Sequence, residues 1–132
     1  YPWVVKGYVN FLHSSTADVS PSGGTATPSL NSSDITFYAG VNIASVVTYS
    51  TREGIYRINY SDTYAAGKEP GILAFGGRLS ETTSTAIDES ERVALLGIAA
   101  SSTTYCYIHS ADANSANLDL EAVREMTVLI LG

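Results

Sequence analysis

The segment Val41–Asp62, VNIASVVTYSTREGIYRINYSD, predicts a β-hairpin. Its two arms, Val41–Tyr49 and Ile55–Tyr60, are rich in the β-branched and aromatic residues that favour strands. The polar residues Ser50–Gly54 lie between the arms. We expect Gly54 to close this turn, because glycine readily takes the left-handed conformation of a bulged hairpin.

The second arm of this hairpin alternates residue by residue, as a strand with one buried face does. One face carries Tyr56, Ile58 and Tyr60, and the opposite face carries Ile55, Arg57 and Asn59. The first set predicts a core face. The hairpin itself contains nothing that resembles a catalytic motif.

The rest of the 132-residue chain continues the pattern of short apolar runs separated by polar loops. Gly40 is expected to end one run, and Ala100–Ser102 to turn between two others. Residues 13–34 are expected to be a loop, or a loop with a short irregular strand, and residues 78–91 are expected to be a loop. A helix is allowed only over Leu118–Arg124, capped by Asn117. Further strands are expected at Trp3–Leu12, Ile35–Tyr38, Ile72–Phe75, Arg92–Ala99, Thr103–His109 and Met126–Leu131. The sequence thus predicts one all-β domain over residues 1–132, an antiparallel β-sandwich of about seven to eight strands.

The charge balance argues against two classes of partner. Thirteen acidic residues outweigh seven basic ones, for a formal net charge of −6, and the only lysines are Lys6 and Lys68. Nucleic acids and anionic membrane surfaces require clustered Lys and Arg, so neither is an expected partner. No apolar run approaches the roughly 20 residues that span a bilayer, so membrane insertion is not expected either. The first residue is Tyr1 rather than methionine, and we expect the chain to be part of a longer protein.

Catalytic chemistry finds little support in the sequence. The single Cys106 lies in an apolar strand-like run, where a buried, inert thiol is expected. There is no G-x-S-x-G motif, and His13 and His109 are interpreted as ordinary strand-end residues. A hydrolase would need a carboxylate pair, but Glu81, Asp88, Glu89 and Glu91 share one loop, which favours a solvated surface. We therefore expect a protein that is not an enzyme.

Metal binding is weighed at the Asn/Asp-rich tract near the C-terminus. Asp112, Asn114, Asn117 and Asp119 could offer oxygen ligands to calcium, but the EF-hand glycine and terminal glutamate are missing. A polar turn is the preferred interpretation, and no metal or cofactor is expected. Binding residues are instead expected in loops, where rigid scaffolds carry function. The candidates are Tyr64, Tyr105, His109, Asp112, Asn114 and Asn117.

The last strand, Met126–Leu131, is apolar on both faces. Such a strand must be covered on both sides, by its own core on one side and by another surface on the other. In a domain of this size a neighbouring subunit could supply that second cover.

The order of these features resembles the C-terminal domain of many bacteriophage tail fibre proteins. That family typically has an aromatic-Val-Asn-Phe strand, an Asn-Val-Ser-Ser-Ile-type arm, a Gly-x-Tyr-x-Val-x-Phe arm, a Ser/Thr-rich turn and a terminal apolar strand. The chain departs from the family at residues 13–34, at residues 78–91 and in the Asn/Asp tract, all three of them loops. The matching stretches are Gly7–Phe11, Asn42–Val47, Gly54–Tyr60, Ser101–Thr104 and Met126–Gly132.

The resemblance implies a role, because this family has no catalytic motif to transfer. It implies a homotrimer at the distal end of an extracellular virion appendage, joined to other virion tail proteins and attached to a host surface glycan or protein. One alternative is a structural virion module, a trimerising tip or decoration protein that does not bind the host. A polysaccharide-cleaving part of a tailspike ranks last. Fold alone does not decide among these functions.

Overall fold

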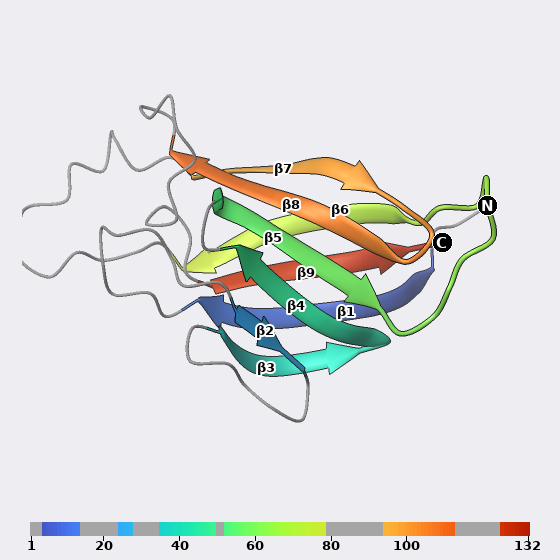
Figure 1. Cartoon of the computed structure of the whole chain (residues 1–132), viewed down its shortest axis with the longest axis horizontal. Coiled ribbons are helices and arrows are strands. Elements are labelled where there is room, and N and C mark those ends of the chain that lie inside the picture. Colours follow the sequence, from blue (N-terminus) through green and yellow to red (C-terminus); the bar gives the residue numbers. More distant parts are fainter. Residues whose placement is uncertain (1–3, 14–23, 28–34, 50–51, 79–93, 113–124) are drawn as a thin grey trace, which may run out of the picture.

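A computed structural model describes residues 4–13, 24–27, 35–49, 52–78, 94–112 and 125–132 of the chain. Nine strands occur in these ranges (Figure 1), and no helix does. None of the described segments could therefore cross a membrane as a helix. The strands are β1 (Val5–His13), β2 (Gly24–Ala26), β3 (Ile35–Val41), β4 (Ile43–Tyr49), β5 (Arg52–Tyr60), β6 (Gly71–Arg78), β7 (Ala94–Ser101), β8 (Tyr105–Asp112) and β9 (Glu125–Leu131).

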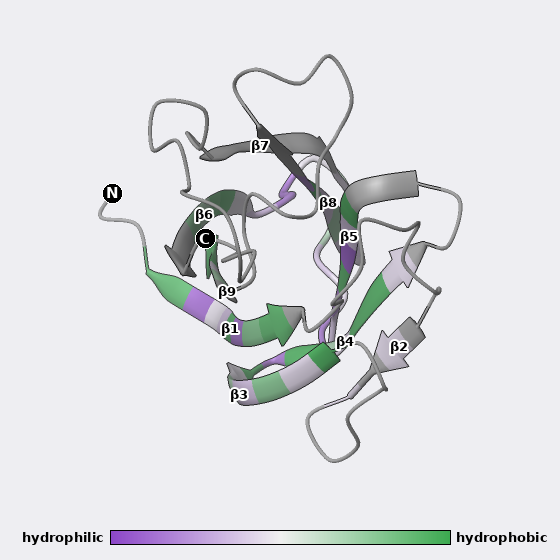
Figure 2. Cartoon of the chain, turned by 90° about the vertical axis from the view of Figure 1, so that its left-hand side faces the viewer, coloured by the Kyte–Doolittle hydropathy of each residue, from purple (hydrophilic) through white to green (hydrophobic). Residues whose placement is uncertain are grey.

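The described strands form two antiparallel sheets. The four-stranded sheet has the order β3-β1-β9-β6, and the five-stranded sheet has the order β2-β4-β5-β8-β7. Figure 2, which looks along the strands, shows the two sheets facing each other across the core. The prediction of an all-β, antiparallel, sandwich-like fold is confirmed. Strands β1 and β9, from opposite ends of the chain, pair in the middle of the smaller sheet, with Val9 opposite Val128.

The core lies between the sheets and takes alternate residues from their central strands. Tyr56 and Phe11, on opposite sheets, pack with ring centroids 5.4 Å apart and planes inclined at 59°. Each large apolar side chain removed from water contributes about 1.5–3 kcal/mol, so this layer supplies most of the driving force for folding. Its fully buried members include Val9, Phe11, Val46, Tyr56, Ile58, Cys106, Ile108 and Val128. The predicted core face of Tyr56, Ile58 and Tyr60 and the predicted buried thiol of Cys106 are both confirmed.

The chain crosses from one sheet to the other at Asn42, between β3 and β4. Asn42 has φ of 58°, a left-handed conformation that asparagine tolerates better than most residues. Its side-chain amide donates to the carbonyl of Lys6 at 2.6 Å, and its own carbonyl accepts from the backbone N–H of Ser61 at 2.9 Å. These two bonds hold the corner against β1 and against the end of β5.

The sequence predicted that Gly40 would end a strand, and this prediction is wrong. Strand β3 runs through Gly40, which pairs with Val9, and ends at Val41. A glycine permits a break without requiring one, and here the pairing with β1 keeps the backbone extended. The irregularity in the β1–β3 pairing lies two residues before Gly40, at Tyr38. Asn10 pairs with Ala39 and Phe11 with Phe37, so Tyr38 has no partner on β1.

Gly54 does not close the hairpin, and that prediction is also wrong. It lies inside β5, which begins at Arg52. Thr48 pairs with Tyr56 and Tyr49 with Arg52, so residues 53–55 have no partner on β4. A bulge of this kind uses up extra residues within one strand and leaves a shorter connection.

The β7–β8 pair lies further toward the C-terminus than predicted. Strand β7 continues to Ser101, and β8 continues past His109 to Asp112. The turn therefore lies at Ser102–Thr104, where the backbone N–H of Ser102 donates to the carbonyl of Tyr105 at 2.8 Å. The helix allowed over Leu118–Arg124 lies outside the described residues.

Candidate functional site

The outer face of the five-stranded sheet carries a group of polar and aromatic side chains. They alternate with core residues: Arg57 and Asn59 flank the buried Ile58, and Tyr105 and Tyr107 flank the buried Cys106. Because successive side chains on a strand point to opposite faces, these residues face away from the core. We call Ser45, Arg57, Asn59, Tyr105 and Tyr107 the polar sheet face. All five are partly buried.

The strand register brings these five residues into two neighbouring rows. Asn59 of β5 lies between Ser45 of β4 and Tyr105 of β8. In the next row Arg57 lies opposite Tyr107. Directly opposed side chains in an antiparallel pair are close enough to interact, so the register alone places all five in contact range.

Two hydrogen bonds connect the polar side chains in series. The Nε–H of Arg57 donates to Oδ1 of Asn59 at 2.9 Å, and Nδ2 of Asn59 donates to Oγ of Ser45 at 2.8 Å. Asn59 therefore uses its amide oxygen toward one neighbour and its amide nitrogen toward the other. This pattern fixes the orientation of the amide and of the guanidinium.

The guanidinium of Arg57 also lies over an aromatic ring. Its Cζ is 4.1 Å from the ring centroid of Tyr105, the arrangement of a cation–π contact. Tyr105 in turn meets Tyr107 edge to face, with centroids 5.3 Å apart and an interplanar angle of 73°. One side of the guanidinium is thus occupied by Tyr105, and its Nε edge by Asn59.

The terminal Nη groups of Arg57 have no hydrogen-bond or ion-pair partner among the residues that the structure describes. Arginine has five N–H donors, and within the described part of the chain only the Nε–H has an acceptor. The polar sheet face therefore presents an oriented cation, hydrogen-bonding groups and aromatic rings on a rigid sheet. That combination is suited to binding a polar ligand.

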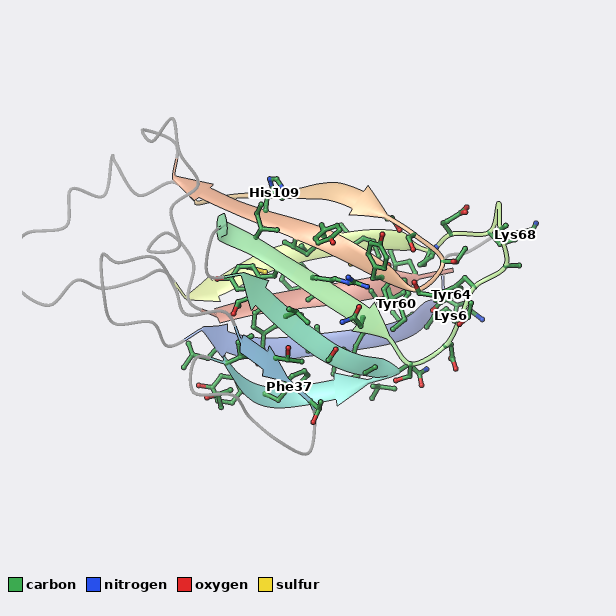
Figure 3. The ribbon with its side chains drawn as sticks, viewed as in Figure 1. Lys6, Phe37, Tyr60, Tyr64, Lys68 and His109 are labelled. Carbon is green, nitrogen blue, oxygen red and sulfur yellow. The ribbon has the colours of Figure 1, made fainter. Side chains whose placement is uncertain are left out.

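Two of the predicted binding residues lie on this side of the sheet. Tyr105 belongs to the polar sheet face. His109 lies on the same side of β8, partly buried and paired with Ile55, one row beyond Tyr107. Figure 3 shows His109 beside β7 and β8.

Tyr64 lies elsewhere. It follows β5 and packs edge to face on Tyr60, with centroids 5.5 Å apart and an interplanar angle of 87°. Its backbone N–H donates to the carbonyl of Thr103 at 2.9 Å. Burial raises the pKa of the Tyr64 hydroxyl. Figure 3 shows it well away from His109, so the structure does not bring these two candidates together.

The remaining candidates belong to the Asn/Asp tract. Asp112 is the last residue of β8, at the opposite end of that strand from Tyr105. Asn114 and Asn117 lie outside the described residues, as do Asp119 and the acidic residues of the 78–91 loop. Within the described ranges, no group of three or more His, Cys, Asp or Glu side chains could hold a metal ion.

The sequence analysis missed four residues of the polar sheet face: Ser45, Arg57, Asn59 and Tyr107. Two of them carried a usable signal, because the alternation of β5 had already placed Arg57 and Asn59 opposite the core. Their proximity to Ser45 and Tyr105 depends on strand pairing, which the alternation does not reveal.

The buried cysteine offers no reactive thiol. Cys106 is fully buried, and burial raises the pKa of its thiol to about 11. A thiolate is the reactive form, so at neutral pH this group stays protonated and unreactive.

The fold and its outer surface define an all-β scaffold with a preformed polar and aromatic face. No protein-family model, curated protein or solved structure matches the chain.

Proposed function

We propose that this chain is a non-enzymatic attachment module that binds a saccharide through the polar sheet face. The observation that carries the proposal is the Arg57 network, in which one cation is held by Asn59 and Tyr105 while its terminal donors have no partner among the described residues. Sugars present hydroxyl groups around an apolar ring surface, and oriented donors beside aromatic rings complement both. A preorganised site also loses less side-chain entropy when its ligand binds.

The setting that we propose is a virion. The resemblance to tail fibre C-terminal domains supports an extracellular position on a phage appendage, next to other virion tail proteins. The ligand would then be a host surface glycan, or a glycan on a host surface protein.

We also propose that the chain acts as a homotrimer, and the outer face of the four-stranded sheet supports this. Leu73, Phe75 and Val41 are 51%, 47% and 47% exposed on this face. The buried side chains of β9 are those of Met126, Val128 and Ile130. Leu129 and Leu131 point the other way and are partly buried. We call this surface the apolar sheet face; it comprises Val5, Tyr8, Val41, Leu73, Phe75, Leu129 and Leu131.

The apolar sheet face also favours the alternative function, a structural virion module without host binding. Exposed apolar patches of this kind commonly mark association surfaces. Assembly through this face would need no ligand on the polar sheet face. The two functions therefore make different predictions about the polar sheet face alone.

The experiment is binding of the purified chain to an array of bacterial surface polysaccharides, with its oligomeric state measured in parallel by sedimentation. We expect a trimer that is retained by at least one polysaccharide. Arg57→Gln should abolish retention, whereas Lys68→Gln, which removes the same charge from an exposed side chain in the 61–70 loop, should not. A trimer that no polysaccharide retains would contradict the attachment function and leave the structural module.

A further inference from the structure

We propose that the saccharide bound by the polar sheet face is acidic, and that its carboxylate is held by the two terminal Nη groups of Arg57. This inference rests on the proposed function, because it names the class of saccharide that the same site takes.

The first step is the orientation of the guanidinium. A guanidinium can present either its Nε side or its Nη1–Nη2 end to a carboxylate. In this chain the Nε–H is already donated to Asn59, and one face of the group lies against Tyr105. The Nη1–Nη2 end is the fork that remains for a second partner.

The second step is the match between that fork and a carboxylate. Two parallel N–H groups pair with the two oxygens of a carboxylate, and such charge-assisted bonds are roughly twice as strong as bonds to neutral acceptors. A neutral sugar hydroxyl offers a single oxygen and no charge. The fork therefore discriminates in favour of an acidic sugar.

The third step is the absence of an internal partner. The chain has 13 acidic residues against 7 basic ones, yet no acidic side chain pairs with Arg57 among the residues described. A partly buried guanidinium without a counter-ion gains more from an incoming anion than one already in an ion pair.

Neighbouring groups can hold the rest of the sugar. Asn59 donates one amide proton to Ser45, so its second amide proton is left for a ligand oxygen. The Ser45 oxygen accepts that bond, and its own proton can be donated onward. Both groups lie one row from Arg57 on the same face. A sugar ring bound at Arg57 would therefore meet donors for its hydroxyl groups.

The test is a set of calorimetric titrations with matched acidic and neutral probes. Two pairs test a carboxylate: trigalacturonate against its methyl ester, and sialyllactose against lactose. A third pair, mannose 6-phosphate against mannose, tests a phosphate in the same way. We expect the chain to bind at least one carboxylated probe about tenfold or more tightly than its neutral match, the factor that one good charge-assisted bond supplies.

Two variants locate this preference on Arg57. Arg57→Lys keeps the charge and loses the fork, so most of the acidic preference should disappear. Asn59→Asp leaves the arginine in place and gives it an internal carboxylate, so the acidic preference should also disappear while thermal stability is kept or increased. The control Lys68→Gln should change neither the acidic preference nor the thermal stability. Loss of preference in Lys68→Gln, or its retention in Asn59→Asp, would overturn the assignment.

The outcomes also separate this inference from the proposed function. If acidic and neutral probes bind alike, the acidic ligand is wrong and the saccharide-binding function stands. If mannose 6-phosphate shows the larger preference, the carboxylate is wrong. If no saccharide binds here or on the polysaccharide array, both proposals fail.

Discussion

The guanidinium of Arg57 lies 4.1 Å from the ring centroid of Tyr105, which is two residues along β8 from the direct partner of Arg57, Tyr107. This diagonal contact links the two rows of the polar sheet face. It also explains how a long, flexible side chain can be held on an open sheet surface when no acidic residue in the described ranges pairs with it.

Replacing the ring of Tyr105 should release Arg57. We expect Tyr105→Leu to weaken saccharide binding about tenfold and to cost about 0.5–1 kcal/mol of stability, the range of an exposed cation–π contact. Tyr105→Phe keeps the ring and should retain most of the saccharide affinity and most of the stability. Titration calorimetry and urea unfolding measure the two effects. Equal losses in the Leu and Phe variants would show that the hydroxyl, and not the ring, matters.

The sheet-crossing corner should be sensitive to the residue at position 42. Asn42→Ala puts alanine, which tolerates the left-handed conformation less well than asparagine, at φ of 58°, and it removes the hydrogen bond to Lys6. We therefore expect a loss of about 2–3 kcal/mol in the free energy of unfolding. Asn42→Gly keeps the conformation accessible and loses only the bond, so its loss should be about 1 kcal/mol. Urea unfolding compares the two. The interpretation of a strained corner fails if both variants are equally stable.

Gly7 should not tolerate a side chain. A β-carbon there would lie 2.9 Å from the backbone carbonyl oxygen of Val41 and 3.3 Å from Cβ of Asn42. Since the backbone of the corner would have to move, we expect Gly7→Ala to cost about 1–3 kcal/mol. Gly40→Ala is the control, because a β-carbon there meets nothing closer than 3.5 Å. A thermal scan in which Gly40→Ala is the more damaging change would contradict this account of the corner.

Stability should fall in alkaline solution because of buried acids that stay neutral in the fold. Burial raises the pKa of Cys106 from 9.0 to about 11, so between these values the folded chain keeps a proton that the unfolded chain releases. The stabilisation is therefore complete below pH 9 and is lost as the pH rises toward 11, by about 1–3 kcal/mol. Burial also raises the pKa of Tyr56 and Tyr60, which extends the loss above pH 10.

Cys106→Ala separates the thiol from the tyrosines. In urea unfolding from pH 7 to 11, this variant should lose less stability than the parent chain between pH 9 and 11. The decline that remains above pH 10 should be the part due to Tyr56 and Tyr60. A profile identical to that of the parent chain would mean that the thiol does not contribute.

The strands of this fold were predictable where alternation is strong. The alternation of β5 separated Ile58 from Arg57 and Asn59 correctly, and β9 was correctly predicted as a strand with one face in the core. The cover expected on its second face stays a prediction. Local periodicity suffices for such features because it reflects which side of a strand meets the core.

The turns and the site were harder, for different reasons. Gly40 and Gly54 were predicted to mark a strand end and a turn, but both lie within strands. Pairing with β1 keeps the backbone extended at Gly40, and Gly54 lies in a bulge of β5. The actual corner uses Asn42, which no local pattern singled out. The polar sheet face depends on the register among β4, β5 and β8, and a shift of one residue would turn Arg57 toward the core.

On the proposed function, a saccharide binds where Arg57, Asn59 and Tyr105 meet. The most direct measurement is a ¹H–¹⁵N NMR titration of the labelled chain with the saccharide that binds most strongly on the array. We predict that the Nε–H of Arg57 and the side-chain amide of Asn59 shift most, together with the backbone amides of Tyr105 and Tyr107. Shifts confined to the 61–70 loop around Tyr64, or to the apolar sheet face, would contradict the claim.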